Sequence, residues 1–99
     1  MEPEAVERVI IEVLVEIQTA SGRPNPPIDR EAKPIGDVPG FDSLSGLEAT
    51  VELGARLDCA IPDDVNLFVH ERGTRALRVR EIAQRLHELM APPVASDVR

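Results

Sequence analysis

Apolar residues recur with a helical period near the start of the chain. From Glu4 to Thr19 they fall three or four positions apart, which places them on one face of a helix: Val6, Val9, Ile10, Val13, Leu14 and Ile17. The β-branched run within this segment would also suit a strand. The length of the segment and the spacing of its glutamates favour a helix, so the pattern predicts a helix over 4–19.

Two further apolar stripes predict two more long helices. One runs from about Ser43 to Asp58 and stops before Pro62, which cannot continue a helix. Its apolar positions are Leu44, Leu47, Ala49, Val51, Leu53 and Leu57. The other is expected to start near Thr74 as its N-cap, after a break at Arg72-Gly73, and to end before the prolines at 92–93. Its apolar positions are Leu77, Val79, Ile82, Ala83, Leu86 and Leu89.

The segments between these stripes have different compositions. Prolines and glycines crowd residues 20–41 and prevent a long helix there. Ile28, Ile35 and Val38 are expected to pin this long loop onto the core, and loops of this length are often functional. A short helical turn is expected from Asp63 to His70.

Together these elements predict an all-α fold, a four-helix bundle with three main helices and a short third one. The 99 residues suffice for one domain, expected over 1–91, with a mobile tail at 92–99. The chain has only two aromatic residues, Phe41 and Phe68. Its core must therefore be built mainly from aliphatic side chains, which suits packed helices.

Charge narrows the classes of partner. Residues 1–64 carry 14 acidic and 5 basic side chains, net −9, and residues 65–99 carry 4 acidic and 6 basic, net +2. An acidic surface repels nucleic-acid phosphates and anionic membranes, so neither is an expected partner. A basic protein surface would be attracted and would associate faster through electrostatic steering. The partner-facing surface should lie in the first two-thirds of the chain.

Other chemistry is not indicated by the sequence. The single cysteine, Cys59, allows no internal disulfide and suits a packing role. No signal peptide is visible, so the reducing cytoplasm is the expected setting. The protein is also expected to be a monomer. The apolar run within 9–17 is too short to span a bilayer. His70 and His87 lack a ligand cluster, so no metal site is expected. Ser43 lacks a Gly-x-Ser-x-Gly elbow, and no set of nucleophile, base and orienting group accompanies it, so the chain is not expected to be an enzyme.

Ser43 stands where the Pro/Gly-rich loop meets the second long helix. A serine at a helix start has its hydroxyl beside backbone N–H groups that lack helical partners, and these groups and the helix dipole favour an attached phosphate. The simpler interpretation is that Asp42 or Ser43 only caps the helix.

The residues around this serine resemble a known family. Gly40-Phe41-Asp42-Ser43-Leu44 is similar to the attachment motif of acyl carrier proteins. The resemblance extends over nearly the whole chain, through Glu7-Arg8-Val9, Leu47-Glu48, Val51-Glu52-Leu53, Ile61-Pro62-Asp63 and Val79-Arg80-Glu81-Ile82. It implies an acyl-carrier-type four-helix bundle.

The resemblance also implies a function. In this family a phosphopantetheinyl transferase moves 4′-phosphopantetheine from coenzyme A to the serine that Ser43 matches, using Mg²⁺, and the arm then carries an acyl group as a thioester. Asp42 matches the acidic residue that helps the transferase and its metal, and Leu44 completes the attachment motif. The implied partners are that transferase and the enzymes that load and process acyl groups.

Further roles are implied for residues along and after the second helix. Leu44, Leu47 and Val51 match apolar positions that partner enzymes grip, with core packing as the alternative, which is open for Leu47. Glu48 matches an acidic recognition position, with a solvated helix face as the alternative. Phe68 is expected to border the pocket for the acyl chain, with plain core packing as the alternative.

Some features depart from the fatty-acid members of the family. Positions that are usually acidic hold Ser45, Gly54 and Ala55, and Arg56 adds a positive charge. The 64–78 segment is also longer than in the short carriers, and the Pro/Gly-rich approach to Ser43 is more similar to carriers of specialised pathways. A peptidyl carrier and an unmodified helical adaptor are the alternatives.

Overall fold

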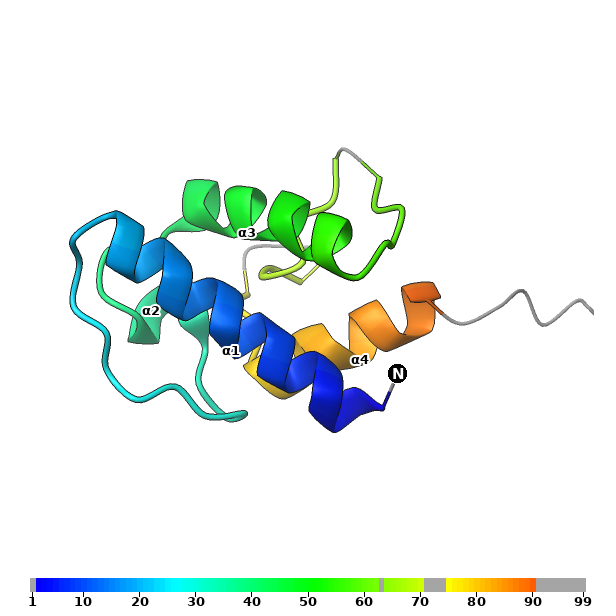
Figure 1. Cartoon of the computed structure of the whole chain (residues 1–99), viewed down its shortest axis with the longest axis horizontal. Coiled ribbons are helices and arrows are strands. Elements are labelled where there is room, and N and C mark those ends of the chain that lie inside the picture. The colour runs from blue at the N-terminus through cyan, green and yellow to red at the C-terminus, as the bar shows by residue number, and fades with distance from the viewer. Residues whose placement is uncertain (1, 63, 71–74, 91–99) are drawn as a thin grey trace, which may run out of the picture.

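The computed structural model describes residues 2–62, 64–70 and 75–90, and these contain four helices (Figure 1). The helices are α1 (Pro3–Ala20), α2 (Pro34–Asp37), α3 (Ser43–Arg56) and α4 (Val79–Met90). These residues form no strand, and their extended pairing is limited to an isolated antiparallel bridge between Val69 and Ala76. The prediction of a helical fold is therefore confirmed for the part of the chain described.

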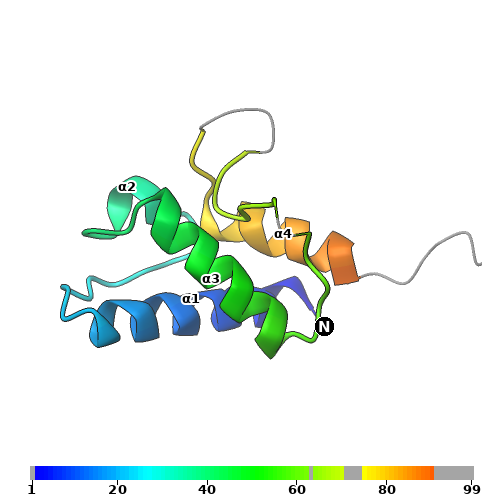
Figure 2. The same cartoon turned by 90° about the horizontal axis from the view of Figure 1, so that it is seen from above.

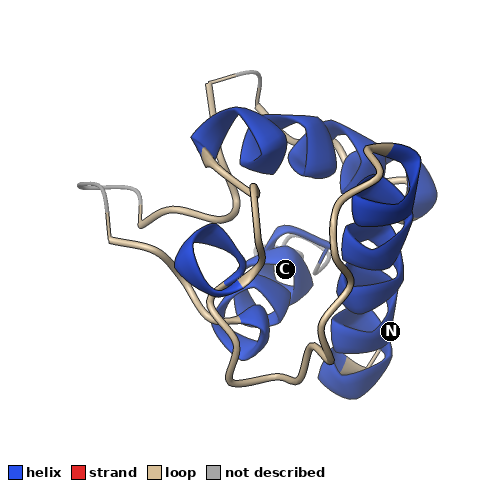
Figure 3. Ribbon diagram, turned by 90° about the vertical axis from the view of Figure 1, so that its left-hand side faces the viewer, coloured by secondary structure: helices blue, strands red, loops and turns tan. Residues whose placement is uncertain are grey.

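The three long helices bury the predicted apolar stripes against one another. α1 packs against both α4 and α3, and α3 lies across α1 when the molecule is seen from above (Figure 2). Seen end-on, the helices surround one shared interior (Figure 3). The fully buried residues of this core include Val6, Ile10, Val13, Leu14, Leu53, Ile82 and Leu86. Burial of each large aliphatic side chain stabilises the fold by about 1.5–3 kcal/mol.

The long loop between α1 and α3 is held against this core, as predicted. Val38 is buried, and Ile28 and Ile35 pack on the core at its edge. The buried Gln18 of α1 ties two points of the loop together, because its Nε2 donates to the carbonyl oxygens of Pro24 at 2.9 Å and Pro39 at 2.8 Å. α2, within this loop, is a single distorted turn.

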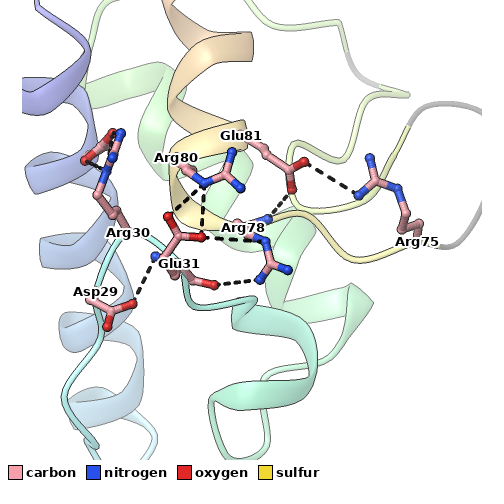
Figure 4. Close-up of polar contacts among 8 residues, drawn as sticks. Asp29, Arg30, Glu31, Arg75, Arg78, Arg80 and Glu81 are labelled. Carbon is pink, nitrogen blue, oxygen red and sulfur yellow. Dashed lines mark hydrogen bonds and ion pairs between the residues drawn. The ribbon is translucent and has the colours of Figure 1, made fainter.

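The last helix begins later than its expected start near Thr74. Helix α4 starts at Val79 because the long loop supplies hydrogen-bond acceptors at that point. The N–H groups of Val79 and Arg80 donate to the carbonyls of Ala32 and Arg30, at 2.9 and 3.0 Å. The Arg80 side chain pairs with Glu31, and the Arg78 N–H donates to Glu81, as Figure 4 shows. Leu77 is buried as the stripe required, but it precedes the helix.

The short helix expected over 63–70 is absent from the described residues of that segment, 64–70, so that prediction is wrong there. The segment forms turns instead. Asn66 Oδ1 accepts the N–H of Phe68 at 3.0 Å, a local contact that competes with helical hydrogen bonds. The Leu77 N–H then donates to the Phe68 carbonyl at 3.0 Å, and the His70 N–H to the Arg75 carbonyl at 2.8 Å.

Several expectations lie outside the described residues. These are the cap at Thr74, the break at 72–73 and the tail at 92–99.

Candidate functional site

Ser43 is the first residue of α3, and its side chain is exposed. The residues before it fix this position. Gly40 has φ +74°, which glycine adopts readily, and the Phe41 N–H closes a turn onto the Val38 carbonyl at 3.0 Å. The Phe41 ring is buried against Phe68, with ring centroids 5.3 Å apart. A buried anchor two residues before Ser43 therefore sets where the helix starts while the serine stays in solvent.

Asp42, and not Ser43, caps this helix. Its Oδ1 accepts the backbone N–H of Ser45 at 3.0 Å and the Ser45 hydroxyl at 3.2 Å. Within the described part of the chain, the Ser43 hydroxyl has no hydrogen-bond partner and is left free. The cap and a chemically available serine are thus two different residues.

The capping contacts also set the charge of Asp42. The N–H of Ser45, followed by its hydroxyl, holds the pKa of the Asp42 carboxyl below its ordinary value. A carboxyl whose pKa is lowered on folding stabilises the fold above its unfolded-state pKa of about 4, and this contribution is lost as the pH falls through the folded-state pKa.

This shift predicts how an Asp42→Asn variant responds to acid. An asparagine oxygen can accept the same N–H but does not titrate in this range. We expect the melting temperature of wild type minus that of the variant to shrink as the pH falls below about 4. Thermal melts of both proteins from neutral to acidic pH measure this difference, and a difference that stays constant would show that the charge of Asp42 does not support the fold.

An exposed apolar ridge follows Ser43 along α3. Its members, Leu44, Leu47 and Val51, are 66%, 41% and 75% exposed. Their spacing of three and four residues places them on neighbouring turns of one helix face. Core packing, the alternative for Leu47, does not account for a side chain this exposed. Glu48, which is also exposed, follows Leu47 on α3 and is therefore turned about 100° around the helix axis from it.

A groove of about 480 Å³ lies beside this ridge, between α3 and the segment that follows it. Leu47 and Val51 form its helix side, and Ile61, Pro62 and Val65 form much of the other side. Cys59 also borders the groove. The groove is thus mainly apolar and continuous with the exposed ridge.

Phe68 does not line this groove. It is fully buried, and its contact with Phe41 accounts for its position in the core. Its expected contact with an acyl chain stays a prediction.

The sequence interpretation missed Asn66, which contacts the carbonyl of the candidate serine. Its Nδ2 donates to the Ser43 carbonyl at 3.0 Å. Gly46 permits this approach, since a Cβ at that position would lie 2.9 Å from Asn66 Oδ1. A glycine in the interior of a helix was the available signal, because such a residue often marks a close approach.

Comparisons with known proteins found no match to this chain among family models, curated proteins or solved structures.

No helix among the described residues combines the length and apolar content needed to cross a bilayer.

Proposed function

We propose that this chain is an acyl carrier protein that receives 4′-phosphopantetheine on Ser43. The observation that carries the proposal is the exposed, unbonded Ser43 hydroxyl at the start of α3, followed on the same helix by the exposed apolar ridge. The fold would then be an acyl-carrier-type bundle. The chain has no catalytic role of its own in this proposal.

The local electrostatics support a phosphodiester at this position. A helix N-terminus carries partial positive charge and N–H groups without helical partners, which favour an attached phosphate. In the transfer, the serine oxygen bonds to the β-phosphorus of coenzyme A as the bond to the adenosine-bearing phosphate breaks. The transferase would take the serine proton, and its Mg²⁺ would neutralise the phosphate charge. Asp42 directly precedes Ser43 in sequence, and its carboxylate would assist the transferase and its metal in addition to capping the helix.

The remaining features support a role as a shuttle between enzymes. The ridge of Leu44, Leu47 and Val51 offers apolar contacts to acyl-loading and acyl-processing enzymes, and the neighbouring groove offers an apolar surface to a cargo. The pathway would be fatty-acid, polyketide or related acyl biosynthesis in the cytoplasm.

The charge of Glu48 is expected to assist docking. A Glu48→Lys variant should be modified and loaded a few-fold more slowly than wild type at low salt, because a rim charge acts mainly on the association rate. Initial rates with a phosphopantetheinyl transferase measure the effect. Glu12→Lys, which makes the same charge change at an exposed position of α1, is the matched control. Equal rates for all three proteins would show that Glu48 is only a solvated helix residue.

The function itself is tested by incubating the purified chain with coenzyme A, Mg²⁺ and a broad-specificity phosphopantetheinyl transferase. We expect the intact mass to rise by one phosphopantetheine. An unchanged mass, with an authentic carrier modified in parallel, would reject the carrier and leave the adaptor, which uses the same ridge but needs no hydroxyl at Ser43.

A further inference from the structure

A second groove, of about 360 Å³, lies between α1 and α3. Ile17 and Ala20 of α1 supply the apolar walls that are open to solvent, and the fully buried Val13 borders the groove from the core. Three carboxylates line it as well: Glu16 from α1, and Glu48 and Glu52 from α3. The positions 48 and 52 are turned about 100° around α3 from the ridge positions 47 and 51, so this groove faces a different direction from the ridge.

Arg56 links the two sides of this groove. Its Nε donates to Glu52 Oε2 at 2.8 Å along α3, and its guanidinium also bonds Glu16 Oε1 on α1. Glu48 has no hydrogen bond or ion pair within the described residues. One arginine of the chain thus neutralises two of the three carboxylates and leaves the third open.

We propose that the α1–α3 groove binds a segment of a partner protein that carries aliphatic side chains and a lysine or arginine, and that Arg56 competes with that cation for Glu16 and Glu52. The proposal goes beyond the carrier function, because it requires neither the arm nor Ser43. It makes Arg56 the residue that sets how strongly this face attracts basic partners.

Charge and exposure support this occupant. Residues 1–64, which include every residue of the groove lining, have 14 acidic and 5 basic side chains, net −9, so a second copy of the same face would be repelled. Glu16 and Glu52 are about half-exposed even though Arg56 pairs with both. Exposed ion pairs contribute little net free energy, and an incoming cation can therefore replace Arg56 at small cost.

The test titrates a short synthetic peptide of leucine and lysine into the unmodified, isotope-labelled chain at low salt. In wild type we expect NMR shift changes at Ile17 and Ala20, the apolar groove residues that solvent can reach. Arg56→Gln should bind the peptide about two- to five-fold more tightly, since it frees two carboxylates. Glu48→Gln should bind more weakly than wild type. Arg80, on α4, forms an exposed ion pair with Glu31 of the long loop, so Arg80→Gln removes the same charge away from the groove and should bind much as wild type does.

Two results would overturn the proposal. One is a set of shift changes on the Leu44, Leu47 and Val51 ridge without changes at the groove. The other is peptide binding by Arg56→Gln that is unchanged or weaker, in a variant whose thermal melt shows that it folds. If Arg56→Gln does not fold, unchanged binding by Glu48→Gln overturns the proposal in its place. Since the peptide assay uses the unmodified chain, these outcomes are independent of whether Ser43 takes an arm.

Discussion

Replacing Ser43 with alanine is expected to abolish addition of the arm. The reaction needs an oxygen nucleophile, and alanine has none. Alanine is a poor N-cap, but Asp42 caps α3, so the substitution should leave the start of the helix unchanged. Intact mass after incubation with coenzyme A and the transferase measures the loss. We expect no added mass in the variant and one phosphopantetheine in wild type.

Two controls separate this loss from damage to the fold. Ser21→Ala makes the same change at another exposed serine, at the end of α1, and should be modified fully. The circular dichroism spectrum of Ser43→Ala should match that of wild type, because the Ser43 side chain is exposed and makes no hydrogen bond in the described structure. A Ser43→Ala protein that still gained the arm would refute the site.

Replacing Phe68 with alanine is expected to cause the largest loss of stability. Phe68 is fully buried and packs against Phe41, and removal of such a side chain costs roughly 3–5 kcal/mol of unfolding free energy. Denaturant unfolding of the unmodified proteins measures the loss. Leu89→Ala, at an apolar position that is 44% exposed, is the control and should change stability far less. A small loss for Phe68→Ala would mean that the surrounding core is already partly open.

The same variant tests whether Phe68 touches the cargo. The measurement compares the melting temperatures of wild type and Phe68→Ala, each unloaded and carrying a medium-length acyl chain. If Phe68 borders the bound chain, loading should shift the two proteins by different amounts. Equal shifts would leave Phe68 as a core residue without contact to the cargo.

The sequence predicted the long helices where local pattern and core packing agree. The stripe from Val6 to Ile17 predicted the position of α1 to within a residue at each end. The start of α3 at Ser43 was also predicted, but the helix ends at Arg56, two residues before the expected Asp58, where the backbone takes a positive φ. The start of α4 could not be predicted in this way. It depends on the carbonyls of Arg30 and Ala32, almost fifty residues earlier, which accept the first N–H groups of the helix. No local propensity encodes such a contact.

The candidate site divides in the same way. Ser43 and the ridge of Leu44, Leu47 and Val51 followed from local sequence, since a helix start and a helical period place them. Asn66 and Arg56 did not, because each acts through a residue far away in the sequence: Asn66 through the Ser43 carbonyl, and Arg56 through Glu16. The turns at 64–70 were missed for a related reason, as Asn66 holds the Phe68 N–H that a helix would use.

The most direct test of the carrier function is to locate the arm on the wild-type chain. The protein would be co-expressed with a broad-specificity phosphopantetheinyl transferase, and the segment between Arg30 and Arg56, which contains both Ser43 and Ser45, would be fragmented in a mass spectrometer. We predict one phosphopantetheine per chain, on Ser43. An arm on Ser21, Ser45 or Ser96, or a chain without added mass, would contradict this function.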